Sequence, residues 1–465
     1  MRDDYFSSNE FKQNLQLYEQ GKGALLDSEI LTDIADHYRA QGFMDKALGA
    51  ADFALTLYPG ATAPLVFKAR AALAEEDVER AEALVDSIDD KTDLDYHYMK
   101  AELLIARRKE DEADAYLEAQ MEEIDAQTKP DYVLDVATLF GDYDLMEWAE
   151  KWLSRSDETD LDDYKELWGR ILVDKGETEE AVKLFEELVE RDPFSPVYWN
   201  LLGTTQWMQQ HYADAVASSE YALAIDPRSE EALMTKAGCL SMLGNFEEAL
   251  TYYERYASIT RCKDTAEMYV GVTLATLERN KECIPHLQAA LEASDPASPN
   301  LPQIYNELVL ALMKENRVEE AEQYVTEAEK SSCDPNEMKV LHGHILLMQG
   351  RVEEAQQYMY DAYMNSGMSA HIVMRVAISL NQNGYISLAY DMLEALLDDM
   401  DEQHTDGYGH LAACAYELGK NEAFLKYLKV AVERNPVEAR FMLSDIFPPG
   451  MPTQEYYDYA KKHLT

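Results

Sequence analysis

Apolar and small residues recur along this chain with the spacing of paired helices. The clearest stretch is Trp199-Asn200-Leu201-Leu202-Gly203, followed by Ala215, Ala222 and Pro227. With Pro196 as position 1, its apolar, small and proline residues occupy positions 4, 7, 8, 20, 27 and 32 of a 34-residue frame. Such a frame holds two helical segments joined by a turn, and a proline ends the second segment because it cannot continue a helix.

Two positions of this frame hold small residues along nearly the whole chain. Position 8 is occupied by Ala35, Ala69, Ala101, Ala137, Gly169, Gly203, Ala237, Gly271, Gly343, Ala377 and Ala412. Position 20 is occupied by Ala47, Ala81, Ala113, Ala149, Ala181, Ala215, Ala249, Ala321, Ala355 and Ala389. We expect the two helices of each unit to cross closely at these positions, because a larger side chain there would push the helices apart.

This pattern resembles the tetratricopeptide repeat (TPR), which has a large residue at position 4, small residues at 8, 20 and 27, and proline at 32. The resemblance extends over about twelve tandem units in residues 28–436, and it is weaker in residues 62–161 and 264–301. It implies an all-α fold, an α-solenoid in which antiparallel helix pairs form a right-handed superhelix. Helical caps are expected at both ends, an N-terminal capping helix in residues 1–27 and C-terminal capping helices in residues 437–465, because the terminal repeats of a solenoid would otherwise expose their core.

The predicted turns and the first helix have residues of the expected kind. Glycine stands between the two helices of several units, at Gly42, Gly176, Gly244, Gly350, Gly384 and Gly419. A left-handed turn residue is expected there, and glycine adopts that conformation without steric cost. Near the start of the chain, Ser7 and Glu10 have the spacing of a capping box, and Phe6 and Phe11 that of a hydrophobic staple.

The charge of the chain restricts the partners that it can bind. The sequence has 89 acidic and 41 basic residues, a formal net charge of −48. Nucleic acid and anionic membrane surfaces are therefore not expected as partners. The acidic surface either serves solubility or attracts a protein or peptide partner with basic segments. The five cysteines have no paired spacing and no stretch is apolar enough to cross a bilayer, so a cytoplasmic protein with reduced thiols is expected.

No motif in the sequence indicates catalysis, a cofactor or a metal. A phosphate-binding glycine loop is absent. His410 and Cys414 are four residues apart on a predicted helix, but two ligands alone make a weak metal site, and a core thiol beside a surface imidazole is the favoured interpretation. The acidic loop (residues 157–163) lacks the alternating spacing and central glycine of a calcium loop. We therefore predict that the chain is not an enzyme; a dense cluster of perturbed titratable groups in one pocket would favour the opposite.

The TPR resemblance also implies where a partner binds. In that family the first helices of the units line a concave groove, with positions 2, 5, 9, 12 and 13 facing it and position 6 at its margin. Projected on this sequence, the central part of the groove is rich in methionine, which suits surfaces that accept several apolar shapes. The candidate groove residues are Trp207, Met208, Met234, Met242, Met268, Tyr269, Asn306, Met313, Met348 and Met374.

The function expected from these features is that of a scaffold or adaptor that binds a peptide or helical segment of a partner protein in the groove. Three alternatives stay open at this point. The methionines could be internal packing of the solenoid. The groove could instead hold a small peptide signal, as in a regulatory sensor, or the chain could be a self-associating assembly protein. The oligomeric state does not follow from the sequence.

Overall fold

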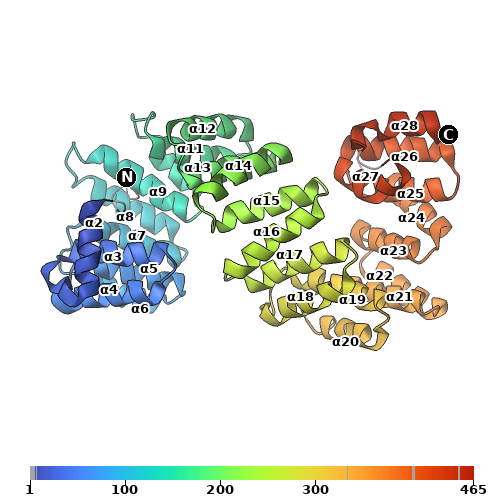
Figure 1. Ribbon diagram of the computed structural model, residues 1–465, viewed down its shortest axis with the longest axis horizontal. Helices are drawn as coiled ribbons and strands as arrows, with labels where there is room; N and C mark the ends of the chain where they lie inside the picture. Colours follow the sequence, from blue (N-terminus) through green and yellow to red (C-terminus); the bar gives the residue numbers. More distant parts are fainter. Residues whose placement is uncertain are drawn as a thin grey trace. The chain divides into compact units, whose positions relative to one another are not determined.

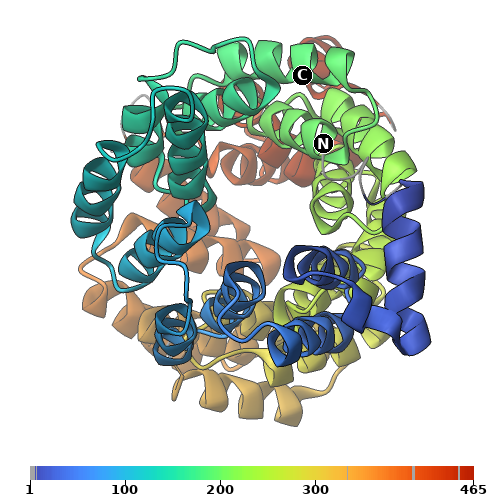
Figure 2. The ribbon, with the colours of Figure 1, turned by 90° about the vertical axis from the view of Figure 1, so that its left-hand side faces the viewer.

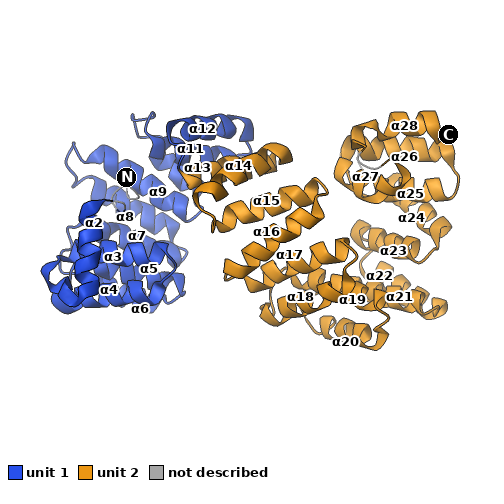
Figure 3. Cartoon of the chain, viewed as in Figure 1, with its two compact units in different colours: residues 1–194 blue, residues 195–465 orange. Residues whose placement is uncertain are grey.

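The computed structural model describes residues 6, 8–331, 333–398, 400, 404–448 and 451–464, and most of these residues are helical (Figure 1). They contain no β-strand. The chain divides into two compact units, residues 1–194 and 195–465 (Figure 3), which we call unit 1 and unit 2. Within the described residues, no helix combines the length and the apolar character needed to cross a bilayer.

Unit 1 is a stack of helix pairs that begins with a single helix. Its elements are α2 (Asn9–Leu17), two short helical turns (Tyr18–Lys22 and Gly23–Leu25), α3 (Ser28–Ala40), α4 (Met44–Leu57), α5 (Thr62–Ala74), α6 (Val78–Asp86), α7 (Leu94–Ala106), α8 (Glu110–Met121), α9 (Lys129–Asp142), α10 (Met146–Leu153), α11 (Asp162–Asp174) and α12 (Thr178–Arg191). Each odd-numbered helix from α3 packs on the even-numbered helix that follows it.

Unit 2 repeats this arrangement and ends in shorter helices. Its elements are α13 (Pro196–Met208), α14 (Tyr212–Ile225), α15 (Glu230–Met242), α16 (Phe246–Ile259), α17 (Lys263–Thr276), α18 (Asn280–Ala293), α19 (Leu301–Lys314), α20 (Val318–Ala328), α21 (Pro335–Met348), α22 (Val352–Asn365), α23 (Ala370–Gln382), α24 (Ile386–Asp398), α25 (Tyr408–Glu417), α26 (Asn421–Arg434), α27 (Pro436–Leu443), two 3-10 turns (Ser444–Ile446 and Thr453–Glu455) and α28 (Tyr456–His463). The predicted all-α solenoid of helix pairs is confirmed, and the boundaries of the individual repeats stay a prediction.

Both ends of the chain carry helices that cover the neighbouring pair. Figure 2 shows α2 in dark blue at the edge of unit 1, and its Phe11 is fully buried in one cluster with Leu31 and Ile34 of α3. At the other end α27 packs on α25, and α28 packs on α26. The terminal helices thus bury apolar surface that the last pairs would otherwise expose.

The predicted capping box at the start of the chain is replaced by a different cap. Ser7 lies outside the described residues, and α2 is capped by Ser8, whose Oγ accepts the backbone N–H of Phe11 at 3.0 Å. Glu10 is therefore not at the third helical position that the capping box requires. The predicted contact of Phe6 with Phe11 is present, with ring centroids 4.9 Å apart.

The turn inside each pair adopts the left-handed conformation even where no glycine is present. The predicted glycines have positive φ, for example +80° at Gly42 and +78° at Gly176. In other pairs the same turn holds a residue with a side chain and a positive φ, namely Glu76, Arg108, Asp144, Gln210, Glu278 or Asn316. Each such residue costs about 1 kcal/mol relative to glycine, so the geometry of the turn follows from the packing of the two helices rather than from glycine.

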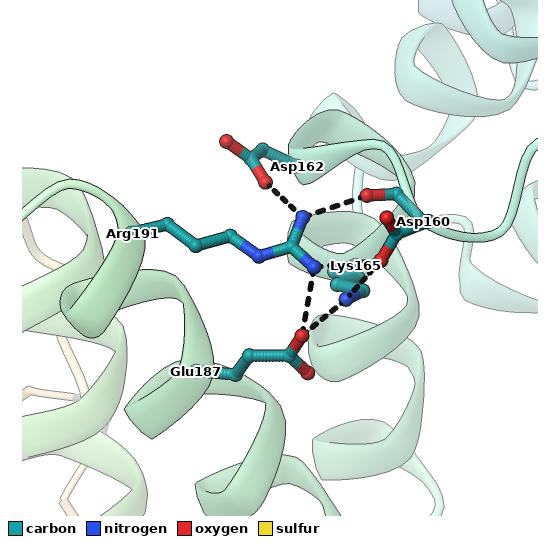
Figure 4. A network of polar contacts seen from close by, with 5 residues as sticks. All are labelled: Asp160, Asp162, Lys165, Glu187 and Arg191. Atoms are coloured by element: carbon teal, nitrogen blue, oxygen red, sulfur yellow. Dashed lines mark hydrogen bonds and ion pairs between the residues drawn. The ribbon is translucent and has the colours of Figure 1, made fainter.

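The acidic loop is held by cations of its own unit rather than arranged around a metal (Figure 4). The guanidinium of Arg191 donates to the Oδ1 atoms of Asp160, at 2.6 Å, and of Asp162, at 2.9 Å. Lys165 bonds to Asp160 at 2.7 Å, and Arg191 also contacts Glu187. Lys165 and then Arg191 hold the pKa of Asp160 at about 2. Among the described residues, no group of three or more His, Cys, Asp or Glu side chains is placed to hold a metal ion.

A second ion-pair network in unit 1 leads to a prediction for acid stability. Arg155, and after it Lys151, hold the pKa of Glu118 at about 2, below its usual range. A carboxylate with a lowered folded-state pKa stabilises the fold above its ordinary pKa, and this contribution disappears as the pH falls towards 2. Glu118→Gln should lower the melting temperature of unit 1 by about 2 °C at pH 7, since the pair is partly solvent-exposed. The difference between wild type and variant should vanish between pH 4.5 and pH 2 in thermal scans; a constant difference over that range would contradict the prediction.

Candidate functional site

In unit 2 several of the first helices pack directly on one another, and α27 packs in the same way. Helix α13 packs on α15, α17 on α19, α21 on α23, and α25 on α27. These helices line one surface, which we call the first-helix face. The residues that were predicted to form the groove lie on these first helices, although not all of them reach the surface.

The predicted groove residues on α13, α15 and α17 differ in the solvent exposure of their side chains. Met208 is the last residue of α13 and its side chain is 57% exposed. Trp207 is half-buried and lies against Gly238 of α15, where a Cβ atom would be 3.3 Å from the indole. Met234, Met242 and Tyr269 are half-buried.

Met268 does not belong to the surface, and its prediction as a groove residue is wrong. Its side chain is 2% exposed and lies in a core cluster with Leu240 of α15 and Tyr253 of α16. Met313 of α19 is likewise buried, in the same cluster. The first helices approach so closely that side chains directed between them are enclosed. The alternative that some methionines are internal packing is correct for these two.

In the second half of the face, Met348 is the last residue of α21 and is exposed. Met374 of α23 is half-buried, and its methyl group lies so close to Gly407 that a Cβ atom there would be 2.3 Å from it. Asn306 of α19 lines a polar pocket. Its side chain contacts a charged group of another first helix, the guanidinium of Arg375 on α23.

The polar pocket has a volume of about 330 Å³ and is formed by α19, α21, α23, α25 and α27. Its charged and titratable lining residues, together with Asn306, are Glu307, His344, Arg375, His410 and Glu438. They come from five different helices, so the stacking of the first helices brings them together.

Arg375 supplies a fixed positive charge in this pocket. Its Nη2 donates to Asn306 Oδ1 at 2.6 Å, and Asn306 in turn donates to Glu307 Oε1 at 3.1 Å. Within the described part of the chain, no carboxylate lies within ion-pair distance of Arg375. Burial raises the pKa of Glu307, and the hydrogen bond from Asn306 and the charge of Arg375 oppose this shift.

The two imidazoles of the pocket are uncharged at neutral pH. Burial, and after it the charge of Arg375, lower the pKa of His344 to about 4, and burial lowers that of His410 to about 4. Burial raises the pKa of Glu438, although this carboxylate accepts backbone N–H groups of Gly407 at 2.8 Å and Gly409 at 3.2 Å. His410 was expected to be a surface imidazole, but α27 covers it.

Two side chains of the pocket have the spacing of a nucleophile and a base. Ser379 Oγ lies 2.9 Å from His344 Nδ1, the pairing of a nucleophile with a base. Ser379 lines the pocket and is 4% exposed, and His344 is 7% exposed. Among the described residues, no carboxylate is hydrogen-bonded to the other ring nitrogen of His344. The pocket can hold a polar group through hydrogen bonds and the charge of Arg375, which is a binding function.

Arg375, Glu307 and His344 are absent from the predicted site residues. They occupy positions 6, 6 and 9 of their repeats, and position 6 was assigned only to the margin of the groove. A search for charged residues at positions 6 and 9 of successive first helices could have found them. In the sequence, each is a single polar residue on a different helix.

Comparisons with known proteins agree with the repeat pattern. Family models for the tetratricopeptide repeat match residues 167–230 and 206–261. A TPR repeat-containing protein of Rhizobium etli is 25% identical over 114 residues. That match covers 24% of this chain and 56% of the relative, so the chain matches little more than half of the length of this relative.

Several solved structures are similar to parts of the chain. PilF of Pseudomonas aeruginosa is 17% identical, with 48% of this chain and 97% of that chain covered and a TM-score of 0.38. MamA of Desulfovibrio magneticus is 17% identical, with 36% and 93% covered and a TM-score of 0.34. YrrB, described as a TPR protein with an unusual peptide-binding site, is 17% identical, with 38% and 90% covered and a TM-score of 0.34.

The family assignment rests on the repeat itself. The 34-residue frame places small residues where paired helices cross, the structure consists of such pairs, and two family models match the central part of the frame. This chain therefore contains tetratricopeptide repeats, which the family models match over residues 167–261.

Proposed function

We propose that this chain is a scaffold that binds a peptide or helical segment of a partner protein on the first-helix face of unit 2. Tetratricopeptide-repeat proteins generally bind protein or peptide partners, and they generally act as scaffolds without catalysis. The observation that carries the proposal is the polar pocket, in which Arg375 is a cation without an ion-pair partner among the described residues.

The chemistry of the pocket restricts the segment that fits it. A carboxylate of the partner would pair with Arg375, since a guanidinium binds a carboxylate through two parallel hydrogen bonds. Phe441 of α27 also lines the pocket and is largely exposed, so it offers an apolar surface beside the charge. Met348, which is exposed at the end of α21, offers a further apolar surface outside the pocket lining. We expect the bound segment to combine one acidic group with apolar side chains.

A selection from a random peptide library on the immobilised full chain tests this function. Peptides with a carboxylate next to apolar residues should be enriched. Arg375→Gln should weaken their binding about tenfold or more, because a charge-assisted hydrogen bond contributes about 1.5–3 kcal/mol. The matched control is Lys429→Gln, which removes an exposed cation of α26 that lies 3.7 Å from Glu433.

Two outcomes would contradict the proposal. Selected peptides that bind Arg375→Gln as tightly as wild type would show that the pocket is not the site. Equal losses in both variants would show that the peptides respond to net charge. The sensor alternative differs in that a short peptide alone should bind tightly and change amide hydrogen exchange far from the pocket. Sedimentation velocity without peptide tests the self-association alternative.

A further inference from the structure

We propose that a second surface of unit 2, on helices α22 and α24, docks a basic amphipathic helix of a partner protein. This surface goes beyond the proposed function, because it is formed mainly by second helices of the repeats and not by the first-helix face. It is an apolar groove of about 660 Å³, which we call the outer groove.

The floor of the outer groove is core, and its walls are exposed. Val376 and Leu380 of α23 lie at the floor and are buried. Tyr360 on α22 is 56% exposed and Leu388 on α24 is 51% exposed, and Met368 before α23 is exposed to a similar extent. Large apolar side chains gathered at this exposure are typical of an interaction surface rather than of scattered surface residues.

The shape of the groove fits a helix. The lining residues of α22 run from Val352 to Tyr363 with helical spacing, a distance of about 17 Å along the helix. Three turns of a partner helix cover that length. An apolar helix face bound in a groove between two helices is a common mode of peptide recognition, and the methionines that line this groove adapt to different side chains.

The acidic residues around the groove favour a partner helix with a positive charge. Helices α22 and α24 contain no Lys or Arg. Glu353, Asp391 and Asp398 each lie within two residues of a lining residue. Within the described residues, none of these three carboxylates forms an ion pair, whereas Arg351, just before α22, is held by Glu354. An amphipathic helix whose polar face carries Lys or Arg therefore fits this groove, and an acidic one is repelled.

Fluorescence anisotropy with designed peptides and the full chain tests the proposal. The probe is a labelled peptide of Leu and Lys, about four turns long, with leucines at positions i, i+3, i+4 and i+7. A peptide of the same composition in scrambled order controls for net charge, and a peptide with Glu in place of Lys controls for the sign. The amphipathic Lys peptide should bind, and the two controls should bind at least about tenfold more weakly.

Substitutions in the outer groove, with one control substitution in unit 1, test where the peptide binds. Leu388→Asp should weaken the Lys peptide at least about tenfold, because it places a charge in the apolar contact. An aspartate in the first turn of α24 is compatible with the helix, so this variant should fold. The double variant Glu353→Lys/Asp391→Lys should also weaken binding, through charge alone. The matched control is Leu25→Asp, at an apolar residue of unit 1 that is even more exposed, and it should change the affinity less than about twofold.

Three results would overturn the proposal, and each would point to a different explanation. Equal binding of the amphipathic and scrambled peptides would show attraction to the acidic surface in general. Wild-type affinity in Leu388→Asp would place the peptide elsewhere. If sedimentation velocity showed that wild type self-associates and that Leu388→Asp separates the copies, the occupant would be a second copy of this chain and not a basic helix.

Discussion

Trp152→Ala is expected to lower the free energy of unfolding of unit 1 by about 4 kcal/mol, the largest loss that we predict for a single side chain. Trp152 on α10 is completely buried. Its Nε1–H donates to Asp114 Oδ1 at 2.9 Å, and its ring meets Tyr132 edge-on at a centroid distance of 6.1 Å. The guanidinium of Arg155 lies 4.2 Å from the indole centroid. Alanine would leave a cavity among these groups and remove a donor from a buried carboxylate.

The effect should be local as well as large. Repeats of a solenoid contact only their neighbours, so the loss should fall on the helices around α10. In amide hydrogen exchange, α9 to α11 should lose protection in Trp152→Ala while α3 and α4 keep theirs. The transition assigned to unit 1 should move down by about 10 °C in a thermal scan.

Trp148 offers a matched control on the same helix. It is half-buried and stacks on Phe140 at a centroid distance of 5.9 Å. Trp148→Ala should cost about 2 kcal/mol or less, since less apolar surface is uncovered. Equal losses in the two variants, or loss of protection throughout unit 1 in both, would contradict the description of α10 as a helix with one buried and one partly exposed tryptophan.

The repeat frame predicts the fold because its signals depend on contacts within one unit. Small residues such as Ala149 and Ala181 are fully buried where the paired helices cross. Such contacts repeat in every pair, so a single sequence contains many copies of the signal. The turn conformation is equally local, although the side chains of Gln210 and Asn316 show that glycine is not required for it.

The candidate site depends on contacts between units, and these do not repeat. Met208 and Met348 end their helices and are exposed, whereas Met313, one frame position earlier, is enclosed. Arg375 meets Asn306 although 69 residues separate them. Which residues at positions 5, 6 and 9 meet in a pocket depends on the offset between successive first helices. The 34-residue frame does not specify that offset.

Gly169→Leu should lower the free energy of unfolding of unit 1 by about 3 kcal/mol, the second largest effect that we expect. Gly169 is at position 8 on α11, where the helix crosses α12. A Cβ atom on this residue would lie 2.4 Å from Cε1 of Phe185, which is completely buried. Because this ring is part of the core, the added side chain must either displace it or move α11 and α12 apart. Chemical denaturation of the full chain, followed by hydrogen exchange at α11 and α12, measures the loss.

Gly49→Ala is the matched control, because Gly49 is also within a helix but has no atom within 4 Å of an added Cβ. This change should stabilise unit 1 by about 0.5–1 kcal/mol, since alanine loses less backbone entropy in a helix than glycine does. If steric contact with Phe185 causes the loss at Gly169, then Phe185→Leu should cost less in the Gly169→Leu background than in wild type. The two changes would then be non-additive, as expected for residues in contact. Additive losses would mean that Gly169 is small for a reason other than the crossing of the two helices, and the role assigned to position 8 would be wrong for this repeat.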